Sequence, residues 1–135
     1  MRVVPRAVIV SASEHRATLP SQRRLHVPGE YSAVASARRV LKGQSFDLHY
    51  LSRDDRTLTR LGMIVPKRLA RAAVLRNSVK RQAREAFRLA RFDRGADLVL
   101  RLKRPIQPVA TRDKNQLRNL RTEIESLFAR FAAGS

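Results

Sequence analysis

The sequence predicts a single α+β domain, a two-layer sandwich in which helices cover one sheet, in the order α-β-β-α-β-α. The chain has 135 residues, of which 43% are hydrophobic, and this is enough for one core. Apolar and polar residues alternate over 46–51, as in a half-buried strand, whereas apolar residues recur at helical spacing over 79–90 and 117–131. These three observations exclude a wholly disordered basic chain.

The first helix is predicted over residues 28–43. Pro28 suits a helix start and Gly43 suits a helix end. The apolar face of this helix would consist of Tyr31, Val34, Ala35 and Leu41.

Two strands follow, and their spacing predicts a hairpin. Over residues 46–51, Asp47 and His49 point to one face and the apolar residues between them to the other. A polar turn at 53–56 leads to the partner strand over 58–65.

The second half of the chain predicts a loop over 67–75, a helix over 77–91, a strand over 97–103 and a C-terminal helix. Asn77 or Ser78 can cap the first of these helices. Asp113 and Gln116 have the spacing of a capping box for the last helix. Its core face would consist of Leu117, Leu120, Ile124, Leu127, Phe128 and Phe131.

Residues 1–24 precede this domain, which we place at residues 25–133. They show no clear period and contain two prolines, so we expect a flexible basic extension. A short strand over 8–10 is the alternative. The cations of the extension are Arg2, Arg6, Arg16, Arg23 and Arg24.

The charge is strongly positive and unevenly distributed. Lys and Arg number 29 against 11 Asp and Glu, a net charge of +18, and 24 of the 29 are arginines. Half of this net charge lies between Arg60 and Arg94. At 100° per residue one side of the predicted 77–91 helix forms a basic column: Arg76, Lys80, Arg84, Arg88 and Arg91, with Arg81 beside it. Neighbouring like charges repel, so we expect this face to contact the phosphates of a nucleic acid.

No feature of the sequence points to catalysis by the protein itself. The chain has no cysteine, which excludes disulfides, thiol nucleophiles and cysteine zinc sites and fits the cytoplasm. The three histidines share no helical or strand spacing: His15, His26 and His49. The acidic pair at 54–55 suits a turn. We therefore assign no catalytic residue and no metal ligand, and expect Glu85 to pair with Arg81 or Lys103.

The 76–88 segment, RNSVKRQAREAFR, resembles the signature of the bacterial ribonuclease P protein component. The matching residues are Arg76, Asn77, Lys80, Arg81, Arg84, Glu85, Phe87 and Arg88; Ser78 departs from the pattern. Residues 61–68, 25–34 and 97–105 are also similar to segments of that family, so the resemblance covers about residues 25–131.

The resemblance implies a ribosomal-protein-S5-domain-2-like fold in the order α-β-β-β-α-β-α, with a left-handed βαβ crossover. The additional short strand would lie near residues 73–74. It also implies a protein subunit of ribonuclease P, which assists endonucleolytic removal of the 5′ leader from precursor tRNA. In that family the RNA subunit performs the hydrolysis with bound Mg²⁺, so we predict no cofactor on the protein alone.

The resemblance also assigns roles to individual residues. The contacts with the catalytic RNA would come from Arg76, Asn77, Lys80, Arg81, Arg84, Arg88, Lys67 and Arg68. The leader cleft would include Tyr31, His49 and Lys67, with Ala35 and His49 standing where the family often has aromatic residues. From its spacing alone, Tyr31 could equally be a core residue. The partners implied are the catalytic RNA and precursor tRNA, in the cytoplasm and without a membrane.

Two other kinds of protein would also account for the basic charge. A basic protein of the ribosome or of ribosomal RNA would show a similar charge and fold. A membrane-surface protein is disfavoured because the basic helix lacks a bulky apolar insertion face.

Overall fold

The computed structural model describes residues 19–53, 58–93, 95–106 and 114–134. Within these ranges the chain forms three α-helices and four strands, preceded by one 3₁₀ turn, η1 (Ser21–Arg23). In chain order they are α2 (Pro28–Ser36), β1 (Val40–Lys42), β2 (Phe46–Ser52), β3 (Arg60–Ile64), α3 (Ala73–Leu89), β4 (Ala96–Leu102) and α4 (Lys114–Gly134). No helix among these residues is long and apolar enough to span a membrane.

The strands form one mixed sheet in the order β1-β2-β4-β3. β4 pairs antiparallel with β2 and parallel with β3. The predicted hairpin between the strands at 46–51 and 58–65 is therefore wrong. β4 takes the place between them because it is apolar on both faces, with Leu98, Val99 and Leu100 all buried, as a central strand requires.

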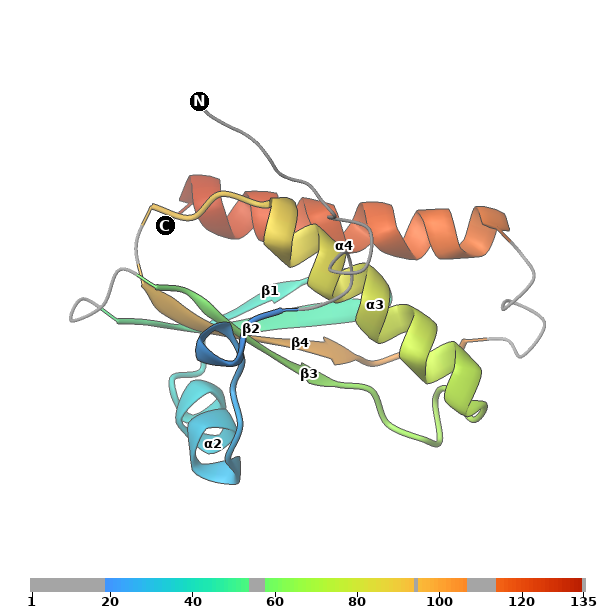
Figure 1. Ribbon diagram of the computed structural model, residues 1–135, viewed down its shortest axis with the longest axis horizontal. Helices are drawn as coiled ribbons and strands as arrows, with labels where there is room; N and C mark the ends of the chain where they lie inside the picture. The colour runs from blue at the N-terminus through green and yellow to red at the C-terminus, as the bar shows by residue number, and fades with distance from the viewer. Residues whose placement is uncertain (1–18, 54–57, 94, 107–113, 135) are drawn as a thin grey trace.

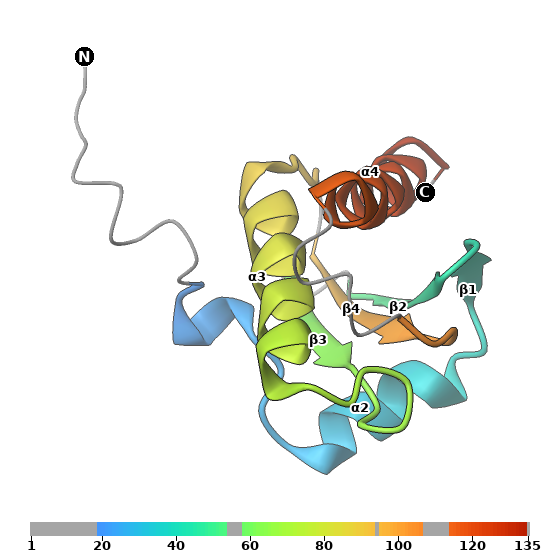
Figure 2. The same ribbon diagram turned by 90° about the vertical axis from the view of Figure 1, so that its right-hand side faces the viewer.

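The helices cover both faces of this sheet. α3 and α4 lie side by side on one face and α2 lies on the other (Figures 1 and 2). The β3-α3-β4 unit crosses over on the α3 side in the left-handed sense, which is uncommon for a parallel pair. The predicted α+β sandwich and its crossover are confirmed.

The first helix is shorter than predicted. α2 ends at Ser36, and Arg38 then takes a left-handed conformation with φ of 55°. Residues beyond it form β1, which pairs with β2 through Leu41 and Leu48. The prediction of a short strand near residues 73–74 is therefore wrong, since these residues begin α3. The additional strand is β1, which pairs with the edge of β2.

α3 begins four residues before the predicted start. Ala72 occupies the N-cap position without a side-chain hydrogen bond, so neither Asn77 nor Ser78 caps the helix. Burial of Leu75 explains the longer helix, because an extra turn brings this side chain into the core. The apolar arc predicted for α3 is confirmed by burial of Val79, Ala83, Ala86 and Phe87.

The predicted core face of α4 is also confirmed. Ile124, Leu127 and Phe128 are at most 1% exposed. On its polar side Glu123 accepts hydrogen bonds from the backbone N–H groups of Ser45 and Phe46, at 2.8 Å each. This carboxylate holds the tight turn between β1 and β2. Asp113 of the predicted capping box lies outside the described residues.

Residues 19–24 belong to the predicted extension, yet they pack on the fold. Leu19 is buried in the main core. The Arg23 guanidinium lies 4.6 Å from the centre of the Phe87 ring and donates to the Thr59 carbonyl. The Leu25 N–H donates to the Leu61 carbonyl at 3.0 Å. The segment therefore runs along the outer edge of β3. Residues 1–18 lie outside the described part of the chain.

Candidate nucleic-acid interface

The exposed side of α3 carries the predicted basic column. The buried residues Val79, Ala83 and Phe87 fix the rotation of the helix on the sheet, so the residues between them must face outward. Arg81 and Arg88 are exposed, and Lys80 and Arg84 are half-buried. The structure therefore brings these four predicted residues together on one helix.

These cations lack acidic partners in the described part of the chain. No ion pair among the described residues involves Lys80, Arg81, Arg84 or Arg88. Burial lowers the pKa of Arg84, and the positive charge of Arg24 lowers it further. A row of unpaired like charges is an arrangement that an anionic polymer would stabilise.

Arg76 differs from the other cations of α3. Its Nη1 donates to the carbonyl oxygens of Ala70 and Arg71, at 3.0 and 2.8 Å. Arg76 thus holds the loop that precedes the helix. Asn77, next to it, is exposed.

Lys67 and Arg68 lie exposed on that loop, between β3 and α3. The loop has a defined shape because Leu69 and Ala70 are buried and donate backbone hydrogen bonds to the Pro66 carbonyl. The two cations therefore extend the basic surface beyond the start of α3.

Glu85 pairs with a different residue from those predicted. Its carboxylate lies 2.9 Å from Nη1 of Arg121 on α4, and not against Arg81 or Lys103. α4 packs beside α3, and this brings Arg121 to Glu85 from 36 positions away in the sequence. Lys103 instead pairs with Asp47 at 2.7 Å. Glu85 is thus an intramolecular partner, as expected, and ties the two helices together.

Tyr31 lies on the opposite face of the sheet, between α2 and β3. A Cβ at Gly62 would come within 2.7–2.8 Å of the Tyr31 ring and hydroxyl, so only glycine allows this approach. The ring is half-buried beside a small cluster of Leu25, Val34 and Val99. Tyr31 thus supports α2 and remains partly accessible. Ala35, which was predicted on the apolar face of the same helix, is exposed to solvent.

His49 lies on the same face of the sheet as Tyr31. It is the register partner of Val99, which in turn is the partner of Gly62, so all three lie in one row across the strands. Burial lowers the pKa of His49, the Asp47 carboxylate opposes this effect, and Arg101 adds to it. The ring is therefore neutral near pH 7 and able to accept a hydrogen bond. No hydrogen bond or ion pair among the described residues joins Lys67 to Tyr31 or His49.

The structure also reveals site residues that sequence reasoning missed. A cavity of about 190 Å³ lies between residues 19–25, α2, β3 and α3. Its walls include Arg24 and Tyr31 together with Lys80 and Arg84. It therefore joins the basic face of α3 to Tyr31. Arg24 was missed because it lies in the segment assigned to the extension.

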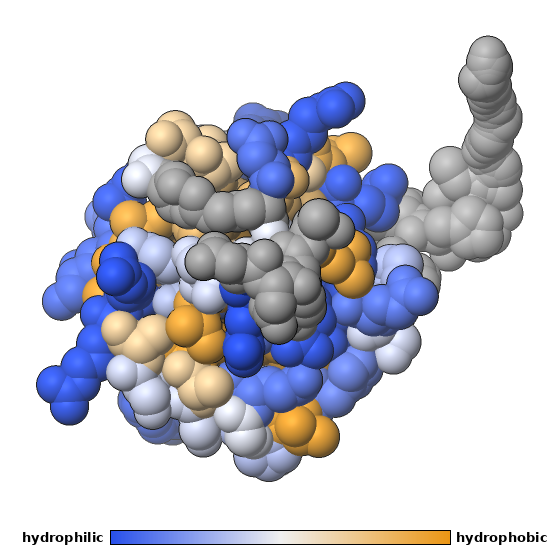
Figure 3. All heavy atoms as spheres, turned by 90° about the vertical axis from the view of Figure 1, so that its left-hand side faces the viewer, coloured by the Kyte–Doolittle hydropathy of each residue, from blue (hydrophilic) through white to orange (hydrophobic). Residues whose placement is uncertain are grey.

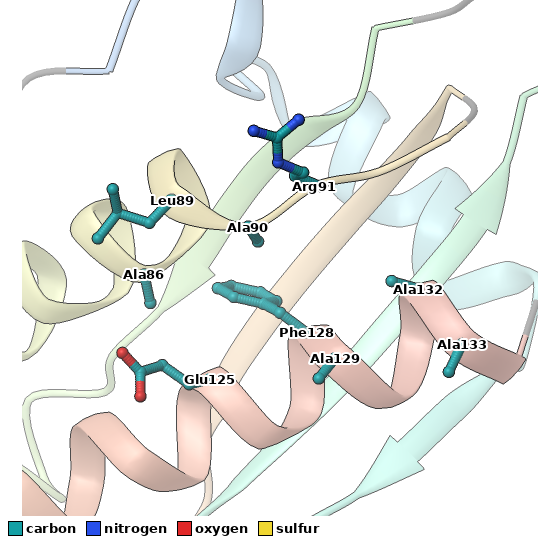
Figure 4. A pocket seen from close by; sticks show the side chains of 9 residues that line it. All are labelled: Ala86, Leu89, Ala90, Arg91, Glu125, Phe128, Ala129, Ala132 and Ala133. Atoms are coloured by element: carbon teal, nitrogen blue, oxygen red, sulfur yellow. The ribbon is translucent and has the colours of Figure 1, made fainter.

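A larger hollow of about 520 Å³ lies between the C-terminal parts of α3 and α4 (Figure 4). Its lining is mostly apolar, with Phe128 and several alanines, and Glu125 and Arg91 are its charged residues. At the end of the molecule drawn in Figure 3, hydrophilic side chains are interrupted by separate small hydrophobic patches. Arg91 was predicted to belong to the basic column of the helix over 77–91, but α3 ends at Leu89, so Arg91 lies beyond the helix and lines this hollow. None of the residues assigned to the RNA contacts or to the leader cleft lines it.

Within the described ranges no three His, Asp or Glu side chains gather in a way that could hold a metal ion.

Comparison with known proteins identifies the family. The sequence model of the family described as Ribonuclease P matches residues 19–132. The ribonuclease P protein component of Bordetella parapertussis is 38% identical over 122 residues, covering 87% of this chain and 98% of that protein. The corresponding protein of Azoarcus sp. is 45% identical over 94 residues, covering 69% and 78%.

Solved structures support the fold. The ribonuclease P protein of Staphylococcus aureus superimposes with a TM-score of 0.65 at 19% identity, covering 79% of this chain and 93% of that one. The protein from Thermotoga maritima gives a TM-score of 0.61 at 21% identity, covering 79% and 96%. The alternative of a ribosome-associated protein is not favoured. With this fold, this basic helix and relatives matched along nearly their whole length, the chain belongs to the ribonuclease P protein component family, as a subunit of that tRNA-processing endoribonuclease.

Proposed function

We propose that this protein docks on the ribonuclease P RNA through α3 and the loop before it, and holds the 5′ leader of precursor tRNA on the α2 side of the sheet. It acts in the cytoplasm. The RNA subunit carries the hydrolysis with its bound Mg²⁺, and the protein contributes affinity and orientation. The observation that carries this proposal is the unpaired basic face of α3.

The chemistry of that face suits an RNA backbone. Arg81, Arg84 and Arg88 offer planar guanidinium groups, which bind phosphate oxygens in pairs and stack on bases. Each phosphate neutralised releases condensed counterions, so binding of this kind weakens steeply with salt. Lys67 and Arg68 would continue the contact along the loop, and Asn77 would add an uncharged donor and acceptor.

The α2 side offers a different surface, suited to a single strand. Tyr31 is a partly accessible ring on which a base can stack, and stacking contributes about 1–3 kcal/mol per base. His49, neutral and half-buried, can form a hydrogen bond with a base edge. Lys67 would hold the backbone of the strand as it passes toward the RNA-docking face.

Cleavage of precursor tRNA by the cognate ribonuclease P RNA tests the proposal. Purified protein should stimulate this cleavage at low Mg²⁺, where the RNA alone is slow. An Arg81→Ala, Arg88→Ala double variant should bind the RNA more weakly, with the slope of log K against log salt smaller by about 0.7–0.9 per lost contact.

Arg118→Ala is the matched control, because Arg118 is exposed on α4 and outside the proposed surfaces. Equal salt slopes for this variant and the double variant would contradict docking through α3. A failure of the wild-type protein to stimulate cleavage would contradict the proposed assistance to catalysis.

A further inference from the structure

The cavity beside β3 has a chemical character unlike the rest of the surface. Its floor is apolar, because Leu19, Leu25 and Leu61 are at most 6% exposed. Among the residues that the structure describes, the charged ones that line it are all cations, Arg24, Lys80 and Arg84, and no described carboxylate lines it. A cavity that gathers three positive charges over an apolar floor is electrostatically unfavourable when empty of anions.

Two of the cations that line the cavity, Arg24 and Arg84, also affect each other electrostatically. Burial lowers the pKa of Arg84, and the positive charge of Arg24, 60 positions away in the sequence, lowers it further. No hydrogen bond or ion pair among the described residues satisfies either guanidinium. The fold therefore holds two like charges together without a partner from the described chain.

Arg24 is held in position by its backbone. Its N–H donates to the Ser21 carbonyl at 3.1 Å, and it forms a parallel bridge with Leu61 on β3. The neighbouring Arg23 is fixed on Phe87 and Thr59. Because the backbone on both sides is held, binding of a ligand by Arg24 costs the entropy of its side chain but does not require the backbone to become ordered.

We propose that this cavity binds one backbone phosphate of RNA, and that Arg24 is an RNA-binding residue. The proposal rests on the proposed function and extends it. A phosphodiester group carries one negative charge and two free oxygens, which suit the two guanidiniums and the ammonium that line this cavity. The cavity volume of about 190 Å³ leaves room for a phosphate group.

The location of the cavity explains what such a contact would do. Lys80 and Arg84 belong to the face proposed for the catalytic RNA, and Tyr31 belongs to the proposed leader cleft. A phosphate bound here would fix the RNA strand at the junction of the two surfaces. The phosphate can come from the catalytic RNA or from precursor tRNA, and the two sources require separate measurements.

The test compares full-length Arg24→Ala with Arg118→Ala, since both lose one exposed positive charge. Arg24→Ala should weaken binding about tenfold, as expected for loss of a charge-assisted hydrogen bond, and lower the salt slope by about 0.7–0.9. Arg118→Ala should change neither quantity. Arg24→Lys should retain the salt slope and lose part of the affinity, because the charge remains and the planar fork is lost. Thermal unfolding followed by circular dichroism checks that all variants fold.

Two binding measurements distinguish the sources of the phosphate. Weaker binding to the catalytic RNA alone assigns the phosphate to that RNA. Unchanged binding to the RNA, with weaker binding of precursor tRNA to the reconstituted holoenzyme, assigns it to the substrate. If Arg24→Ala behaves like Arg118→Ala in both measurements while Arg81→Ala, Arg88→Ala still weakens RNA binding, the phosphate site is overturned and the proposed function stands. If the double variant is also without effect, the proposed docking face fails as well.

Discussion

Arg60 donates from Nε and Nη2 to the two carboxylate oxygens of Asp97, at 3.0 Å each. The two residues are register partners on the parallel strands β3 and β4. The third nitrogen of Arg60, Nη1, donates to Glu30 on α2 at 2.9 Å. One guanidinium therefore joins two strands to the helix that supports the proposed leader cleft, and hydrogen bonds to Asp97 raise the pKa of Arg60.

Loss of the Asp97 carboxylate should destabilise the protein strongly. Asp97 is fully buried, and its removal leaves the charge of Arg60 without its main partner. We expect Asp97→Ala to lower the free energy of unfolding by about 3–5 kcal/mol. Urea unfolding followed by circular dichroism measures this change. Asp47→Ala is the control, since the Asp47–Lys103 pair is partly exposed and should contribute less than about 1 kcal/mol.

The stability of the protein should also depend on Glu30 at acidic pH. Hydrogen bonds from the backbone N–H groups of His26 and Val27, and then from Arg60, lower the pKa of Glu30 below its ordinary value of 4.5. The folded state therefore binds fewer protons than the unfolded state at this site. The stabilisation is complete above pH 4.5 and is lost as the pH falls through the lowered value. The stability difference between wild type and Glu30→Gln should thus shrink from pH 6 to pH 3, and a constant difference would contradict this linkage.

Gly62 should be required for the position of Tyr31. Gly62→Ala would place a Cβ 2.7–2.8 Å from the tyrosine ring and hydroxyl, so the ring must move away. We expect a loss of about 1–3 kcal/mol in unfolding free energy, as for overpacked cores, together with weaker binding of precursor tRNA to the holoenzyme. Gly29→Ala is the matched control, because nothing lies within 4 Å of its added Cβ. Equal effects of the two substitutions would show that Tyr31 does not depend on Gly62.

His49 should titrate below its ordinary pKa of 6.5, because burial disfavours the charged ring. Burial of His49 therefore lowers the free energy of unfolding least above pH 6.5, where the ring is neutral in both the folded and the unfolded state. The free energy of unfolding falls as the pH drops from 6.5 through the lowered pKa. The NMR titration of its ring proton measures the midpoint directly. Arg101→Gln should raise this midpoint and Asp47→Asn should lower it further, since Arg101 lowers the pKa and Asp47 raises it. Shifts in the opposite directions would rule out this account of the site.

Much of the site could be predicted from local sequence. The apolar arc of α3 and the basic column beside it follow from helical spacing, since burial of Val79, Ala83 and Phe87 leaves the cations only the outer side. The alternation over 46–51 likewise identified β2 and the face on which His49 lies. In both cases the spacing of apolar and polar residues within one element decides which of its faces is buried.

Other features depended on contacts between distant segments. The sequence suggested a hairpin for β2 and β3, but β4 pairs between them because only this strand is apolar on both faces. Residues 40–42 were predicted as the end of the first helix, but in the structure they form β1. Hydrogen bonding to β2 outweighs their weak helical preference. The partner of Glu85 also came from another helix, as Arg121 on α4.

The sequence by itself thus determined the family, the helix face that carries the charge and the residues that form the core. Only the tertiary structure decided the strand order, the Arg60–Asp97 pair and the meeting of Arg24 with Lys80 and Arg84. The physical reason is the range of the interactions. Periodicity reports which side of an element is buried, whereas an ion pair or a cavity depends on which elements burial brings together.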